Sequence, residues 1–226
     1  MADAQFVTQA SDQHVIATHK VLRNAYMLLS MTLLFSAAMA AVAIAVEAPH
    51  MGFIPLLVAF AMLFGIYKLK NSVWGIALVF AFTGILGFSI GPFVGYALST
   101  PTGGSTVFTA LGLTGMIFLS LSGYTLVTKK DFSFMSGFLM TGLWVVIGCI
   151  LLMIVGGFFG LHISGLSLAI SAAIVMLMSG FILYDTSRIL HGGETNYVLA
   201  TVSLYLNIYN LFSALLHLLL AFGGDD

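Results

Sequence analysis

Charged side chains are scarce in this chain of 226 residues, which has seven Lys and Arg residues and eight Asp and Glu residues. They make up 7% of the sequence, whereas soluble globular domains carry about 25% charged residues. So few charges cannot cover the surface of a soluble globule, and this class of protein is excluded. The formal net charge of -1 gives no positive footprint for nucleic acid.

Cysteine is almost absent as well. Because Cys149 is alone and lies in an apolar run, we expect it to serve packing, with neither a disulfide framework nor a Cys-based metal site. The loop His191-Gly192-Gly193-Glu194 lacks metal-ligand spacing, and its glycines indicate a helix stop and a turn. We expect His217, in the last apolar run, to be packed or hydrogen-bonded. Because no nucleophile and base can be assembled, the sequence predicts no catalytic residues, no metal site, no cofactor and no enzyme.

Hydrophobic residues, in contrast, make up 60% of the chain, and its mean hydropathy is +1.10. They gather into seven runs that suit helices of ~20 residues, the length needed to cross ~30 Å of hydrocarbon. The predicted fold class is an all-α membrane protein with seven transmembrane helices. The expected spans are residues 25–46, 53–70, 73–98, 107–127, 134–159, 163–190 and 197–222.

All Lys and Arg residues lie in every second gap between these apolar runs. Short loops rich in Lys and Arg stay on the cytoplasmic side of a membrane. The alternation therefore predicts a cytoplasmic N-terminus and a C-terminus on the opposite side. The basic residues are, gap by gap, Lys20 and Arg23, Lys68 and Lys70, Lys129 and Lys130, and Arg188.

Residues 1–23 are the only sizeable polar stretch. We predict that they form a cytoplasmic N-terminal tail ahead of a transmembrane domain of residues 24–226. An alternative is a cleaved signal peptide, because Ala38-Met39-Ala40 has the small-residue pattern of a cleavage site. The apolar run continues past this point to Val46, which favours a full-length span.

Small residues recur at helix-packing intervals in two of the expected spans. They allow helix backbones to approach closely in lipid, so we expect a tightly packed bundle. Such faces serve packing within a chain as well as between chains, and the oligomeric state is left open. Pro92 should free the carbonyl of Phe88, which either bends the third helix or lines a cavity. The small residues are Gly84, Gly87, Gly91 and Gly95 in the third span and Gly137, Thr141 and Gly142 in the fifth.

Asp185 is the one acidic residue embedded in an apolar segment, which makes it the leading site candidate. A carboxylate there is costly unless it faces the bundle interior, finds a partner or takes up a proton. Asp185 lies ~7 Å and Asn207 ~9 to 15 Å from the predicted cytoplasmic ends of their helices, so the Asn207 amide could donate to the carboxylate. The alternative is an ion pair of Asp185 with Arg188 at i,i+3. Further polar groups nearby come from Tyr205, Tyr209 and Asn210.

Several motifs in the C-terminal third form a recognisable series. They are the Leu-Tyr-Asp-Thr-Ser of residues 183–187, a loop motif with His191, Gly192, Gly193, Glu194 and Asn196, and the polar-apolar run of residues 200–212. Together with residues 18–24 and 80–92, they resemble the Bax inhibitor-1 family of multipass membrane proteins, and its bacterial YccA-type members in particular. The resemblance implies seven transmembrane helices with the last one surrounded by the others, in a bacterial inner membrane, with a periplasmic C-terminus.

The resemblance also implies a partner. YccA-type members are regarded as substrates and modulators of FtsH, a membrane-anchored, ATP-dependent protease. The expected partners are therefore FtsH, the membrane proteins associated with it, and the lipid bilayer. In this hypothesis a flexible tail gives the protease its starting point, and the packed helices then resist extraction. The chain would be a slowly degraded substrate that inhibits the protease.

Other members of the family are described as pH-sensitive calcium leaks, in which two aspartates on the last two helices share a proton. Asp185 matches the first of these aspartates, and Asn207 stands where the second would be. An asparagine cannot share a proton as a second carboxylate would. The alternative function is thus a calcium leak with Asp185 as its proton sensor, in which Ca²⁺ is cargo. Arg188 and Asn210 are further candidates for the ion pathway.

Overall fold

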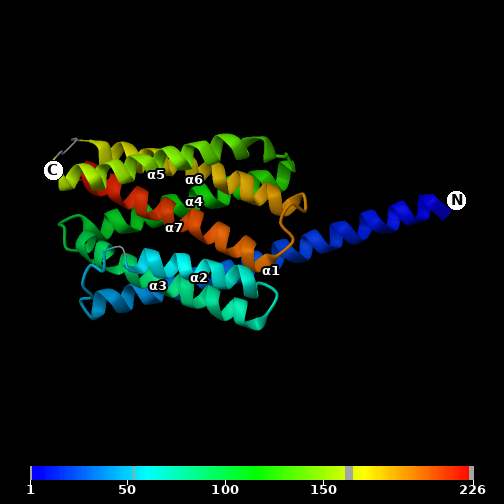
Figure 1. Ribbon diagram of the computed structural model, residues 1–226, viewed down its shortest axis with the longest axis horizontal. Coiled ribbons are helices and arrows are strands. Elements are labelled where there is room, and N and C mark those ends of the chain that lie inside the picture. The colour runs from blue at the N-terminus through cyan, green and yellow to red at the C-terminus, as the bar shows by residue number, and fades with distance from the viewer. Residues whose placement is uncertain (1, 53, 161–164, 224–226) are drawn as a thin grey trace. The chain divides into compact units, whose positions relative to one another are not determined.

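The computed structural model describes residues 2–52, 54–160 and 165–223 (Figure 1). All regular structure in these ranges is helical, which confirms the all-α prediction, and six helices are long and apolar enough to cross a membrane. The helices are α1 (Ala2–Ala45), α2 (Ile54–Leu69), α3 (Val73–Leu98), α4 (Gly103–Thr128), the short 3₁₀ turn η1 (Ser133–Met135), α5 (Ser136–Phe158), α6 (Leu166–Leu190) and α7 (Tyr197–Phe222).

Apart from the start of α1, the helix bounds follow the expected spans closely, and they coincide for α3 and α7. The predicted starts of the second and sixth spans, residues 53 and 163, lie outside the described residues. Helix α2 has 16 residues, ~24 Å, and is shorter than the ~30 Å of hydrocarbon. Helix α4 begins at Gly103, four residues before the predicted start, because this glycine lets the chain pass against the carbonyl of Ala97, where a Cβ would overlap.

The stretch predicted to be an N-terminal tail is helical and forms the first part of α1, a continuous helix of 44 residues. In Figure 1 its first turns, in blue, extend past α2, which belongs to the same compact unit. The reason lies in the sequence, since neither Gly nor Pro occurs before Pro49 and Ala, Gln and Leu favour a helix. The predicted boundary at residue 23 is therefore not a break in the backbone.

The chain forms two compact units. The first contains the residues up to Pro92 together with Asp185–Tyr205, and the second contains Phe93–Tyr184 and the residues from Leu206 on. Helices α3, α6 and α7 each contribute to both units. The division of α3 falls at Pro92, which lies inside a helix that continues to Leu98.

Close packing of α3 against α1 defines the first unit. A Cβ at Gly87 would overlap the carbonyl oxygen of Ser36, and a Cβ at Gly91 would come within 2.5 Å of the Cβ of Ala43. At Gly84, a Cβ would lie 2.7 Å from the Phe35 ring. These contacts confirm the packing role predicted for the three glycines, because none of the three positions leaves room for a Cβ atom.

In the second unit, α5 and α6 pack through small residues of both helices. A Cβ at Gly142 would lie 2.5 Å from Leu177, and one at Gly180 would lie 2.6 Å from Leu139. Gly137 has no such contact within 4 Å among the described residues, so the packing expected of it is not seen. His217 is hydrogen-bonded as predicted, with its Nδ1 atom 3.0 Å from the Ser171 hydroxyl.

Candidate functional site

The loop motif begins with a helix stop. Gly192 has a φ of +74°, and its N–H donates to the carbonyl of Ile189 at 3.2 Å. The N–H of Gly193 donates to the carbonyl of Arg188 at 2.8 Å. This pair of bonds is a Schellman motif, which satisfies carbonyls that the last helical turn leaves free. The predicted stop and turn at these glycines is confirmed.

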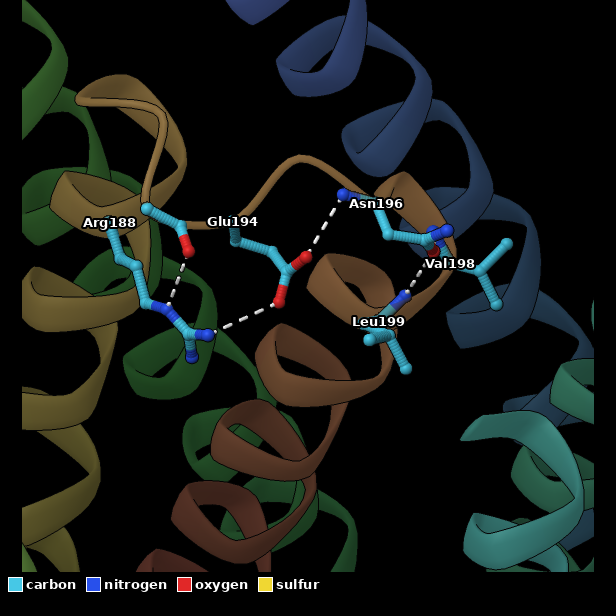
Figure 2. A network of polar contacts seen from close by, with 6 residues as sticks. Arg188, Glu194, Asn196, Val198 and Leu199 are labelled. Atoms are coloured by element: carbon cyan, nitrogen blue, oxygen red, sulfur yellow. Dashed lines mark hydrogen bonds and ion pairs between the residues drawn. The ribbon is translucent and has the colours of Figure 1, made fainter. Parts of the chain in front are cut away.

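Arg188 and Glu194 close the loop on itself (Figure 2). The guanidinium lies 3.4 Å from the Glu194 carboxylate, and its Nε–H donates to the carbonyl of Gly193 at 3.2 Å. The second carboxylate oxygen accepts from the N–H of Asn196 at 2.9 Å. Because the Glu194 side chain is only 16% exposed and precedes the start of α7, its charge also faces the positive end of that helix.

Asn196 caps α7 and ties two loops together. Its Oδ1 atom accepts from the N–H groups of Val198 at 3.0 Å and Leu199 at 3.2 Å, as an N-cap residue does (Figure 2). Its Nδ2 atom donates to the Asn71 side chain at 2.8 Å and to the carbonyl of Lys70 at 3.2 Å. The α6–α7 and α2–α3 loops, which the charge pattern predicts on one side of the membrane, thus meet at one end of the first unit.

The first half of α7 is fastened to α1 and α3 by buried hydroxyl groups. Tyr205 is 1% exposed, and its hydroxyl donates to the carbonyl of Thr83 at 3.2 Å. The Ser36 hydroxyl lies 2.7 Å from the same oxygen. One turn earlier, the Thr201 hydroxyl donates to the carbonyl of Tyr197 at 2.8 Å and lies 3.2 Å from that of Ala25. The hydroxyl groups of Ser36, Thr201 and Tyr205 thereby each have a partner, as buried polar groups require.

Asp185 and Asn207 are both buried, with 9% and 6% exposed. Asp185 belongs to the first unit and Asn207 to the second, so their pairing stays a prediction, as does the pair of Asp185 with Arg188. Since α7 begins at Tyr197, Asn207 lies ~15 Å along its helix and Asp185 ~7 Å from the end of α6. Both distances lie within the ranges expected from the sequence. Asn210 donates to the carbonyl of Leu206 at 2.8 Å within α7.

Sequence reasoning included Asn196 in the loop motif and missed what it does. An asparagine directly before an apolar helical run is a known N-cap signal, so its capping could have been predicted. Its partner Asn71, and the partners Ser36 and Thr83 of Tyr205, carry no local signal. Among the described residues, no group of three His, Cys, Asp or Glu side chains is arranged to hold a metal ion.

These features define a multi-pass helical membrane protein whose basic loops are hydrogen-bonded together. Residues 18–224 match the family described as inhibitor of apoptosis-promoting Bax1. The chain belongs to this family, the Bax inhibitor-1 family.

Three relatives show how far the similarity extends. The chain is 46% identical to the modulator of FtsH protease YccA of Escherichia coli over 206 residues, 91% of each chain. It is also 46% identical to an uncharacterized protein of Pseudomonas aeruginosa over 207 residues, again 91% of each. An uncharacterized membrane protein of Vibrio cholerae is 45% identical over the whole of both chains.

Proposed function

We propose that this chain is a bacterial inner-membrane protein that modulates a membrane-anchored, ATP-dependent protease of the FtsH type, which it inhibits as a slowly degraded substrate. The similarity to YccA supports the partner, because it covers 91% of both chains. The observation that carries the mechanism is α1, which runs from the polar N-terminus into the membrane-spanning segment Thr18–Ala45 as one helix.

The proposal requires the N-terminus in the cytoplasm and the C-terminus in the periplasm. The positive-inside rule supports this orientation. So does the contact of Asn196 with the Lys70 carbonyl, since it joins two of the loops to which the rule assigns one side. The last helix is proposed to be central, in keeping with the burial of Tyr205 against Ser36 and Thr83.

The start of α1 would serve as the handle. A helix of about 20 residues is by itself only marginally stable in water, so a pulling protease would unravel it easily. The next part of α1 is held far more firmly, because Gly87 and Gly91 pack against it and Ser36 is hydrogen-bonded to Tyr205. Pulling would therefore stall at the membrane, and the protease would stay occupied.

Deletion of residues 2–18 tests this mechanism. The truncated protein should still insert into membranes, as measured by its resistance to carbonate extraction, but it should no longer slow the degradation of a reporter by the protease in shared proteoliposomes. A variant with residues 2–17 scrambled keeps the length and composition of the handle and should inhibit like the wild type. Unchanged inhibition by the deletion variant would refute the mechanism.

The second candidate function is a pH-sensitive calcium leak with Asp185 as its sensor. It is favoured by the burial of Asp185, which is 9% exposed and followed by the fully buried Thr186 and Ser187 in a membrane-spanning helix. Calcium entry into proteoliposomes across pH 5 to 8 tests it. A flux whose pH dependence disappears in Asp185→Asn would support the leak. Flux that appears only in Asn207→Asp would show that the natural chain has lost the two-acid gate.

A further inference from the structure

Five of the seven Lys and Arg residues belong to the first unit, and the structure brings them to one end of it. Asn196 joins the α2–α3 loop to the start of α7. One turn further along α7, Thr201 lies 3.2 Å from the carbonyl of Ala25 in α1. Cations from three separate segments of the chain therefore lie within a few helical turns of one end of the first unit. We call this the basic end, and its residues are Lys20, Arg23, Lys68, Lys70 and Arg188.

Negative charge does not balance the basic end. Arg188 is paired with Glu194, and Asp185 is 91% buried in α6. Among the described side chains, the other four cations have no carboxylate within 4.0 Å. Lys70 lies instead 4.5 Å above the ring of Tyr67. The basic end thus presents four positive charges that its own acids do not neutralise.

The surroundings of these charges indicate the lipid–water interface. Tyr67 and Trp74, on either side of the α2–α3 loop, are 63% and 71% exposed. Aromatic rings of this kind gather at the level of the lipid headgroups. On α1, the exposed Lys20 and Arg23 lie next to the partly exposed Leu22, which combines cations with an apolar side chain. An acidic protein segment would be bound by the positive charges alone. A lipid would contact the neighbouring aromatic and apolar side chains as well.

We propose that the basic end binds the headgroups of anionic phospholipids, with Lys20, Arg23, Lys68 and Lys70 contacting their phosphates. Lys and Arg clusters next to membrane helices attract anionic headgroups, and each cation raises the affinity about fivefold. The chain would then gather anionic lipid at one end of its first unit. The second unit carries only the pair Lys129 and Lys130 and serves as an internal comparison.

The two tryptophans of the chain allow a direct test. Trp74 adjoins the basic end, and Trp144 lies on α5 in the second unit with 69% exposed. In the full-length chain, Trp144→Phe leaves Trp74 as the reporter, and Trp74→Phe leaves Trp144. Each protein is placed in phosphatidylcholine vesicles that contain brominated phosphatidylglycerol or, at the same fraction, brominated phosphatidylcholine. Bromine on the acyl chains quenches a tryptophan only when the lipid is adjacent.

Brominated phosphatidylglycerol should quench Trp74 with an apparent affinity at least fivefold above that of brominated phosphatidylcholine, and the two lipids should quench Trp144 about equally. The double substitution Lys68→Gln and Lys70→Gln should lower the preference for phosphatidylglycerol over phosphatidylcholine at Trp74 about fivefold or more. The double substitution Lys129→Gln and Lys130→Gln is the matched control and should leave the lipid preference at Trp74 unchanged.

Equal quenching of Trp74 by the two lipids in Trp144→Phe, with all lysines intact, would overturn the proposal. Inorganic phosphate should not remove the preference when ionic strength is held constant with chloride. Its removal by phosphate alone would also overturn the proposal, because the site would then bind a free anion.

Discussion

A methyl group at Gly87 tests the packing of α1 against α3 at its tightest point. In Gly87→Ala the new Cβ would overlap the carbonyl oxygen of Ser36 and lie 2.6 Å from the Ser36 hydroxyl and 2.8 Å from its carbonyl carbon. Two of these three atoms are backbone, so no rotation of a side chain can relieve the clash. Helix α1 must move away from α3.

The free-energy change has three parts. Overpacking of a tight contact costs about 1–3 kcal/mol. The shift also weakens the buried hydrogen bond of 2.7 Å between Ser36 and Tyr205, which is worth about 1 kcal/mol. Alanine offsets about 1 kcal/mol because it is the better helix former. We expect Gly87→Ala to lower the free energy of unfolding by about 1–3 kcal/mol.

Gly115→Ala in α4 is the matched control, since no atom of the described residues lies within 4 Å of its Cβ position. It should leave stability unchanged or raise it by up to about 1 kcal/mol. Both free energies can be measured by SDS-induced unfolding in mixed micelles, followed by circular dichroism. Equal stability of the two variants would refute the argument that backbone contact at Gly87 holds α1 in place.

Three further substitutions have defined outcomes. Tyr205→Phe removes the hydroxyl that bridges the carbonyl of Thr83 and the hydroxyl of Ser36, and it should lower the free energy of unfolding by about 1–3 kcal/mol in the same assay. Asn196→Ala removes the N-cap of α7 and should cost about 1 kcal/mol and speed amide hydrogen exchange at Val198, whereas unchanged exchange would contradict the capping role. Gly192→Ala forces a side chain into a φ of +74° and should cost about 1 kcal/mol, visible as a lower midpoint of unfolding.

Properties that depend on neighbouring residues could be predicted from the sequence. The bounds of α3 and α7 coincide with the expected spans because hydrophobic runs and the glycines and polar residues between them act locally. The helix stop at Gly192 follows in the same way from one residue that tolerates a positive φ. That the N-terminal stretch is a cytoplasmic tail stays a prediction, but its helical conformation was not anticipated, although the segment has neither Gly nor Pro.

Long-range partners could not be predicted. The sequence indicated that the α2–α3 and α6–α7 loops share a side of the membrane, but only the structure pairs Asn71 with Asn196. Similarly, nothing local links Ser36 to Tyr205, which lie 169 positions apart. Their contact requires α1 and α3 to approach closely at Gly87, and only the packed helices provide that approach. By itself, then, the sequence determined the helical fold class and most of the helix limits, because hydropathy and backbone freedom are local properties. The tertiary structure alone decided which polar groups meet, because hydrogen bonds require atoms within about 3 Å of each other.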